Sequence, residues 1–94
     1  MYQALSSRLH IKDSPIAGQG IFAKEDIPVG LVLGMSHLIV DGVIYRTPLG
    51  GFINHSENPN CMKWCDNDKY FIRTLRLIKS GEELFLKYTF YNIT

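Results

Sequence analysis

The chain of 94 residues lacks the compositional extremes that mark several protein classes. Its two cysteines are too few for the disulfide scaffold of a small secreted domain. Ten Lys and Arg residues against nine Asp and Glu residues give a formal net charge of +1, without the basic excess of a nucleic-acid binder. No apolar run approaches the roughly 20 residues of a membrane-spanning helix. We therefore expect one domain over residues 1–94, with neither a membrane nor a nucleic acid as its direct partner.

The first residues of the chain also lack the apolar core of a signal peptide. This absence predicts an intracellular protein, cytoplasmic or nuclear, that is not secreted. A reducing compartment would keep the two cysteines, Cys61 and Cys65, as thiols.

Glycine and proline interrupt the chain at short intervals. Between residues 15 and 60 they leave no stretch that has both a helical period and a convincing cap, so no helix is expected there. Period-two alternation at residues 8–12 and short apolar runs at 21–23 and 31–33 indicate strands. The sequence thus predicts an all-β domain made of many short strands.

The clearest local signal is a tight hairpin. Two apolar segments, residues 37–40 and 43–45, flank Asp41-Gly42, and this pair tolerates the positive φ angles of a type I′ turn. The other expected elements are a hairpin that joins residues 62–65 to 70–73 across 66–68, and a last strand over about 83–88.

Four segments could carry chemistry. Gly18-Gln19-Gly20 before a strand allows close backbone approach to a ligand, although an ordinary turn is the simpler explanation. Residues 52–61 form a dense polar segment whose Asn, His and Ser side chains could satisfy either buried backbone or a ligand. Residues 78–88 combine a Ser-Gly turn with Glu82 and Glu83, which we interpret as structural or surface-orienting. The aromatic tail that follows could pack as a lid on the core or stack on a flat ligand.

A metal site is considered because His55, Cys61 and Cys65 lie within eleven residues. Structural zinc needs four ligands, and only three candidates are local, with His37 an arbitrary fourth. A Cys–His nucleophile pair is conceivable, but nothing in the sequence marks either thiol as activated. We expect no metal.

Taken in order, the first three of these segments resemble the SET domain, the fold of most protein-lysine methyltransferases. GQGIFA is similar to the opening Gly-x-Gly stretch of the family. FINHSENPNC resembles its most diagnostic motif, and LRLIKSGEELFLKY its closing motif. The resemblance covers about residues 9–90, as expected for a minimal, free-standing member.

This resemblance implies a β-clip of short curved sheets, with a pseudoknot-like threading of the C-terminal segment. It also implies S-adenosylmethionine as the methyl donor and a lysine side chain of a protein substrate as the acceptor. The two would approach from opposite faces through a narrow channel. In this reading the cofactor carries the reactive group, so catalysis is mostly alignment and exclusion of water.

The resemblance also implies roles for individual residues. Tyr88 would be the catalytic phenol of the channel. The residues implied in cofactor binding are Gly18, Gln19 and Gly20 through their backbone, Asn54 and His55, and Phe90 or Tyr91 over the adenine.

Three features depart from the family pattern. The segment between Leu33 and Asn54 is short, the family's tyrosine after the first motif is missing at residues 34–36, and Leu86 stands where an aromatic residue often sets the degree of methylation. These departures keep open a catalytically silent β-clip binding module, and they suggest a homodimer that completes the groove. A nucleic-acid-binding ribbon of basic residues is a third possibility, which a solvated strand face explains more simply.

The near-zero net charge has a consequence for substrate recognition. A basic peptide would need local acidic residues to guide it, because the chain as a whole offers no attractive field. The candidates are Glu57, Asp66, Asp68, Glu82 and Glu83.

Overall fold

The computed structural model describes residues 5–87 of the chain. Its elements in chain order are β1 (Leu9–Asp13), β2 (Gln19–Ala23), β3 (Val32–Val40), β4 (Val43–Arg46), α1 (Pro48–Phe52), β5 (Asn54–His55), β6 (Cys61–Asp66), β7 (Lys69–Thr74) and β8 (Phe85–Leu86). The expectation of a mainly β domain of short strands is confirmed.

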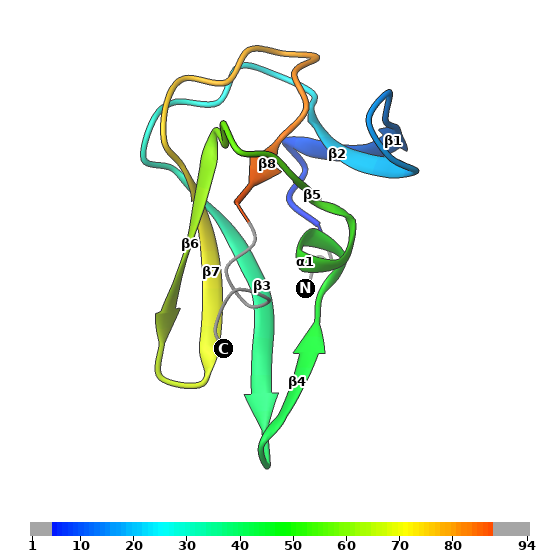
Figure 1. Ribbon diagram of the computed structural model, residues 1–94. Coiled ribbons are helices and arrows are strands. Elements are labelled where there is room, and N and C mark those ends of the chain that lie inside the picture. Colours follow the sequence, from blue (N-terminus) through cyan, green and yellow to red (C-terminus); the bar gives the residue numbers. More distant parts are fainter. Residues whose placement is uncertain (1–4, 88–94) are drawn as a thin grey trace.

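The strands form three small sheets (Figure 1). β1 and β2 pair antiparallel, and a four-stranded antiparallel sheet has the order β4-β3-β7-β6. β5 and β8 form a parallel pair. Figure 1 shows the four-stranded sheet extending away from the end of the molecule where the two smaller sheets lie. The pseudoknot-like threading of the C-terminal segment stays a prediction.

Both predicted hairpins are present. Asp41 and Gly42 have φ angles of 50° and 79°, and Val40 pairs with Val43 across them, as a two-residue type I′ turn requires. The second hairpin has a two-residue loop instead of the predicted three. Asp66 pairs with Lys69 and so belongs to β6.

The third strand is longer than predicted. The apolar run at 31–33 and the segment 37–40 belong to one strand, β3, which runs through Gly34 and Ser36. Its pairing with β7 shifts register between Val32 and Gly34 and again between Met35 and His37. These bulges let one strand continue through residues that break the alternating pattern on which the prediction relied.

The expectation that no helix occurs between residues 15 and 60 is wrong. α1 begins with Pro48, whose fixed φ suits the first helical position, and the Thr47 side chain accepts a hydrogen bond from the Gly50 N–H at 3.3 Å. The Thr-Pro start signal was present in the sequence. Because two successive glycines disfavour a helix, this helix of five residues was not predicted.

The last strand is shorter than the predicted 83–88. The segment is divided because it pairs first with β2 and then with β5. Glu83 forms an isolated bridge with Phe22, and only Phe85 and Leu86 pair with β5. The polar segment expected as a loop therefore contributes Asn54 and His55 to a parallel strand pair.

The core lies where the three sheets meet. The fully buried side chains include Ile21 from β2, Ile72 from β7 and Leu84 next to β8. Each contributes about 1.5–3 kcal/mol by its removal from water. The other buried apolar residues are Leu9, Phe22, Ala23, Ile27, Leu33, Leu49, Ile53, Cys61, Ile78 and Leu86.

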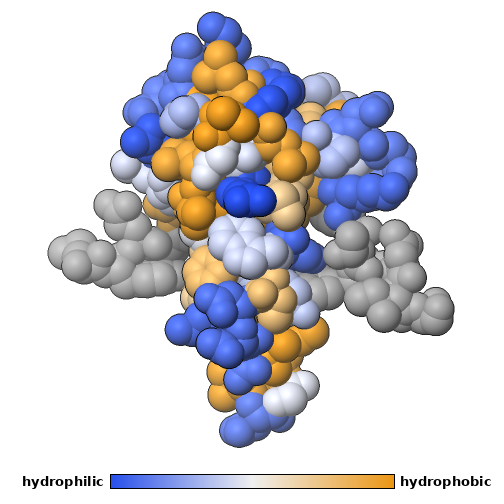
Figure 2. Space-filling model, turned by 90° about the vertical axis from the view of Figure 1, so that its left-hand side faces the viewer, coloured by the Kyte–Doolittle hydropathy of each residue, from blue (hydrophilic) through white to orange (hydrophobic). Residues whose placement is uncertain are grey.

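One side of the molecule keeps apolar groups in solvent, as Figure 2 shows over its upper part. Ile27 and Ile78 form an antiparallel bridge between two loop segments, and both are buried. On the same segments Val29, Leu75 and Leu77 are exposed. Among residues 5–87, no helix is long and apolar enough to cross a membrane.

Candidate functional site

The side chain of Asn54 connects the β5 motif to the glycine segment that precedes β2. Its Nδ2 lies 3.3 Å from the Ala17 carbonyl oxygen and 3.3 Å from the Gln19 carbonyl oxygen. One amide group therefore holds two carbonyls of the loop for which the SET resemblance implies cofactor binding. Gly18 lies between these two carbonyls, with a φ of +48° that favours glycine.

A buried carboxylate completes this arrangement. Glu83 is only 9% exposed. Its Oε2 accepts a hydrogen bond from Asn54 Nδ2 at 2.7 Å, and its Oε1 accepts one from Ser14 Oγ at 2.8 Å. Both oxygens are thus satisfied, which is what makes a buried carboxylate tolerable. We call Ser14, Asn54 and Glu83 the Asn54–Glu83 cluster.

Gly20 makes room for this cluster. A Cβ at residue 20 would overlap the Oε2 atom of Glu83 and lie 3.0 Å from Asn54 Nδ2. A Cβ here would therefore displace the Glu83 carboxylate from its position in the cluster. At Gly18, in contrast, nothing lies within 4 Å of the position of a Cβ, so the backbone at that residue stays approachable.

His55 lies next to the cluster on β5, where it pairs with Leu86. Its Nε2 is 2.8 Å from Glu57 Oε2, and Lys87 Nζ is 3.5 Å from the other oxygen of the same carboxylate. The hydrogen bond with His55, and secondarily the charge of Lys87, lower the pKa of Glu57. Glu57 is thus held between a histidine and a lysine.

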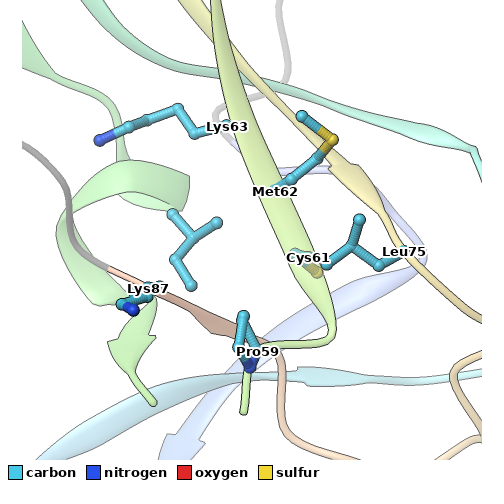
Figure 3. A pocket seen from close by; sticks show the side chains of 7 residues that line it. Pro59, Cys61, Met62, Lys63, Leu75 and Lys87 are labelled. Atoms are coloured by element: carbon cyan, nitrogen blue, oxygen red, sulfur yellow. The ribbon is translucent and has the colours of Figure 1, made fainter. Parts of the chain in front are cut away.

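Beside Lys87, a pocket of about 180 Å³ opens between β6 and β8 (Figure 3). Apart from two lysines its walls are apolar. Its lining residues are Pro59, Cys61, Met62, Lys63, Leu75, Leu86 and Lys87. None of the predicted cofactor residues within 5–87 lines it, so this pocket is separate from the Asn54–Glu83 cluster.

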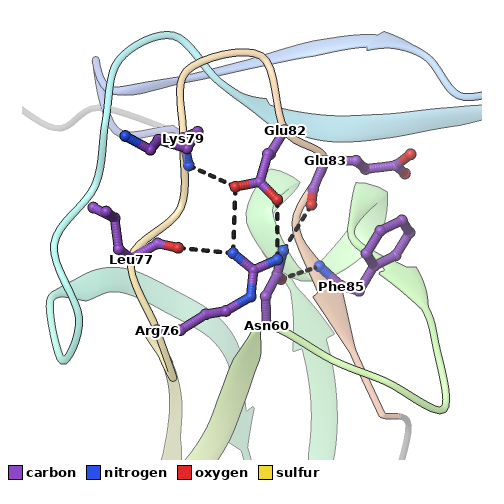
Figure 4. Close-up of polar contacts among 7 residues, drawn as sticks. All are labelled: Asn60, Arg76, Leu77, Lys79, Glu82, Glu83 and Phe85. Atoms are coloured by element: carbon purple, nitrogen blue, oxygen red, sulfur yellow. Dashed lines mark hydrogen bonds and ion pairs between the residues drawn. The ribbon is translucent and has the colours of Figure 1, made fainter.

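The side chain of Asn60 ties the polar motif to the segment before β8 (Figure 4). It is 2% exposed, its Nδ2 donates to the Glu83 carbonyl at 2.9 Å, and its Oδ1 accepts from the Phe85 N–H at 2.7 Å. This asparagine fixes the backbone on both sides of Leu84. It thereby helps to set the position of the Glu83 carboxylate.

Glu82 points the other way from Glu83 and serves the turn. Its carboxylate lies 2.9 Å from Arg76 Nη2 and accepts the Lys79 N–H at 2.6 Å (Figure 4). The hydrogen bond with Arg76 is the main reason that the pKa of Glu82 is lowered. Two adjacent glutamates thus have different surroundings.

A second buried polar group lies under α1. Thr47 Oγ1 donates to the Met35 carbonyl at 2.6 Å, the Thr47 N–H donates to the Ser36 carbonyl at 2.9 Å, and His37 Nδ1 is 2.9 Å from Ser36 Oγ. A Cβ at Gly50 would overlap the Ser36 carbonyl oxygen. We call Ser36, His37 and Thr47 the Ser36–Thr47 cluster.

The structure brings together some of the predicted site residues. Asn54 is hydrogen-bonded to the segment that contains Gly18, Gln19 and Gly20, and His55 is its neighbour on β5. The predicted roles of these residues stay predictions. The other three predicted residues, Tyr88, Phe90 and Tyr91, lie outside the described residues.

Sequence reasoning missed the contribution of Ser14 and the direction of Glu83. The Glu-Glu pair was visible, but two acidic residues in a turn give no sign of which one is buried. The signal that could have distinguished them is the second glycine of the Gly-x-Gly stretch, because a glycine inside a strand indicates a close approach by another group.

The cysteines have different surroundings. Cys61 is buried, and burial raises the pKa of its thiol to about 12. Cys65 is exposed, with its Sγ 3.0 Å from the Asn67 carbonyl oxygen. Within residues 5–87, no three His, Cys, Asp or Glu side chains are grouped so that they could hold a metal ion.

A family model of the SET domain matches residues 35–89, more than half of the chain. The chain therefore belongs to the SET domain family. A search of curated proteins found no significant match.

Solved structures share the fold. A Plasmodium falciparum protein assigned as a histone methyltransferase superposes with a TM-score of 0.75 at 16% sequence identity, over 89% of this chain and 95% of that one. A chain of apo ctPRC2, in a structure with two mutations in Ezh2, gives a TM-score of 0.69 at 22% identity. That match covers 85% of this chain and 15% of the other. Both comparisons establish the fold of this chain as that of SET domains.

Proposed function

We propose that this protein transfers a methyl group from S-adenosylmethionine to the lysine side chain of a protein substrate. The observation that carries the proposal is the hydrogen bonding of Asn54 to both carbonyls that flank Gly18. These two hydrogen bonds join the polar motif to the glycine segment, so that the two motifs of the SET domain form one ordered site.

The residues of the site suit the cofactor. Gly18 leaves its backbone approachable, and the Asn54 side chain holds the loop around it. His55, the neighbour of Asn54 on β5, is half-buried and carries a ring that can pack on a flat group. Gly18, Gln19, Gly20, Asn54 and His55 would hold the cofactor.

When bound, the cofactor supplies a methyl group on a sulfonium, which is already activated toward a neutral amine. The protein's own task is to align that amine and to keep water away from it. The lysine ammonium must lose its proton to water before it reacts, so no strong base is needed at the site. This agrees with the placement of Glu83, whose carboxylate is committed to Ser14 and Asn54.

Tyr88 would orient the acceptor amine through its phenol, and Phe90 or Tyr91 would cover the adenine. A phenol can accept or donate one hydrogen bond without being ionised at neutral pH.

Calorimetry and mass spectrometry test the proposal together. The protein should bind S-adenosylmethionine saturably and add one methyl group to a lysine in a panel of proteins. Tyr88→Phe should lower turnover about 100-fold while cofactor affinity is kept. Tyr45→Phe, at an exposed position on β4, is the matched control and should keep full activity.

Two results would decide against this mechanism. Unchanged activity in Tyr88→Phe would exclude the phenol. Absence of both cofactor binding and methylation would instead favour a catalytically silent binding module of SET fold.

A further inference from the structure

β4 is the open edge of the four-stranded sheet. The strand order is β4-β3-β7-β6, and in the part of the chain that the structure describes only β3 pairs with β4. At the opposite margin β6 has β8 beside it, and residues of both line the pocket between them. In Figure 1 β4 forms the outer margin of the sheet, away from the two smaller sheets. This edge is therefore open to pairing with another strand.

The hydrogen-bond pattern of the β3–β4 hairpin fixes which backbone groups face outward. A two-residue loop makes the pair that flanks it hydrogen-bonded, and such pairs alternate with non-bonded ones along the ladder. The pair of Ser36 and Thr47 continues this alternation, since the Thr47 N–H donates to the Ser36 carbonyl at 2.9 Å. The N–H and C=O groups of Ile44 and Arg46 therefore point away from β3.

The side chains of this edge are mostly apolar and lie in solvent. Val43, Ile44 and Tyr45 are 50%, 50% and 51% exposed. β-branched and aromatic residues of this kind favour extended pairing. Sheet edges are commonly protected by charges or by proline, but β4 carries only Arg46 at its end, and Pro48 follows in α1. The edge thus combines outward-facing backbone groups with exposed apolar side chains.

A second copy of β4 fits this edge in one antiparallel register. Ile44 would pair with Arg46 of the second copy, and Arg46 with its Ile44, so that the outward groups of both residues are hydrogen-bonded. The same register sets Pro48, which lacks an N–H, against Gly42, which lies in the turn with a φ of 79°. The neighbouring symmetric registers use only one of the two bonding residues, because they set the other against Gly42 or Pro48.

Tyr45 would lie on the two-fold axis of this arrangement. The two Tyr45 residues form a non-hydrogen-bonded pair with Cα atoms about 4.5 Å apart, and aromatic pairs at such positions stabilise a sheet by about 0.2–1 kcal/mol. On the other face, the aliphatic part of Arg46 covers Ile44 of the second copy. The two Arg46 side chains lie diagonally and not opposite each other. β4 is thus complementary to itself in hydrogen bonding, in apolar contact and in charge.

We propose that two copies of this chain associate through antiparallel pairing of β4, so that their four-stranded sheets join into one continuous sheet. The contact is isologous and closes as a dimer. It lies in the short segment between Leu33 and Asn54, whose length suggested a homodimer. A pair of four-residue strands buries less area than a standard interface, so we expect monomer and dimer to exchange at micromolar concentrations.

The mass in solution tests the dimer. Sedimentation equilibrium of the full chain should give the monomer mass of 10.7 kDa at about 1 µM and approach twice that mass at about 500 µM. Ile44→Lys puts a charge on the edge and should lower the association constant at least about tenfold. Val40→Lys makes the same change in charge at a 46% exposed position on β3, and this matched control should associate like the wild type.

Cross-linking tests the register. In a Cys65→Ser background, which removes the exposed thiol, Tyr45→Cys sets two thiols across the two-fold axis at disulfide distance. Val43→Cys is equally exposed and on the same face of β4, but in this register its two copies lie about 13 Å apart along the strands. Under mild oxidation Tyr45→Cys should therefore cross-link at least about tenfold faster than Val43→Cys.

None of these readouts depends on methyl transfer, so failure of this inference and failure of the proposed function are distinguishable. A monomer mass at every concentration would overturn the inference and leave the edge to a strand of another protein. A dimer that Ile44→Lys does not weaken would equally overturn it. Equal cross-linking of the two cysteine variants would refute the register, and this comparison holds even if Ile44→Lys does not fold.

Discussion

The two buried polar clusters use the same device in different settings. In each, a glycine leaves space for an oxygen atom that a Cβ would overlap. The Asn54–Glu83 cluster joins residues as far apart as 14 and 83 and contains a carboxylate. The Ser36–Thr47 cluster is confined to residues 35–50 and contains a histidine whose pKa is lowered to about 4.

The difference lies in which atom meets the glycine. At Gly50 it is the backbone carbonyl of Ser36, which is fixed by its place in β3. At Gly20 it is the end of the Glu83 side chain, which can rotate away. The Ser36–Thr47 cluster is therefore a condition for the fold. The Asn54–Glu83 cluster can be disturbed without unfolding the protein, which makes it suited to holding a binding loop.

Gly50→Ala should have the largest effect. Alanine favours helix by about 1 kcal/mol over glycine, yet here its Cβ meets a backbone atom, so we expect a net loss of about 3 kcal/mol of unfolding free energy. Gly51→Ala is the matched control in the same helix, because nothing lies within 4 Å of its Cβ position. Urea denaturation should show a small gain for Gly51→Ala, and a loss in both variants would contradict the space argument.

Acid should weaken the Ser36–Thr47 cluster next. The pKa of His37 falls from 6.5 to about 4 in the folded protein, mainly through burial. The folded state therefore binds fewer protons, and the stabilisation is complete above pH 6.5 and is lost as the pH falls toward 4. The loss amounts to about 2–3 kcal/mol.

Comparison with a variant isolates this contribution. The free energies of unfolding of the wild type and of His37→Gln should be measured with urea across this pH range. Their difference at each pH cancels the contributions of groups that titrate in both proteins. The variant should have the flatter profile. Parallel profiles would mean that His37 is not the group responsible.

Gly20→Ala should cost about 1–2 kcal/mol of stability, because the Glu83 side chain can move. Its larger effect should be on the loop, with S-adenosylmethionine affinity reduced about tenfold once Asn54 loses its partner. In a Glu83→Ala background the same substitution should cost less, since the overlapping carboxylate is gone and only the close approach to Asn54 is left. A double-mutant cycle without coupling would refute the contact.

The smallest effect should come from the exposed side of the Glu-Glu pair. Glu82→Gln weakens a surface ion pair with Arg76 and should cost less than about 1 kcal/mol. It should leave cofactor affinity unchanged. Glu83→Gln, by comparison, should lower that affinity measurably, because one of its two accepting oxygens becomes an amide nitrogen.

Much of the fold was predictable from local sequence. The Asp41-Gly42 turn was predicted because its two residues accept positive φ angles that few others tolerate. The second hairpin was predicted with its loop one residue too long, since Asp66 pairs in β6. The helix α1 was missed because Gly50 is required by a neighbour in space and not by the helix.

The site was predictable only in part, for the same reason. The resemblance of the motifs pointed to Asn54 and to the glycine segment. Nothing local indicated that Glu83 would be buried between Ser14 and Asn54 while Glu82 faced the turn. That difference depends on Asn60, which directly precedes β6 and fixes the backbone around Leu84.

Local sequence was enough to predict the short strands, their tight turns and the family, because these depend on backbone preferences and on motifs read in order. Contacts in the folded chain set the parallel pairing of β5 with β8, the burial of one glutamate of two, and the lysines at the pocket between β6 and β8. These features arise from contacts between residues more than twenty positions apart in the chain. Such contacts leave no periodic pattern in the sequence, since their energy depends on which groups meet in space.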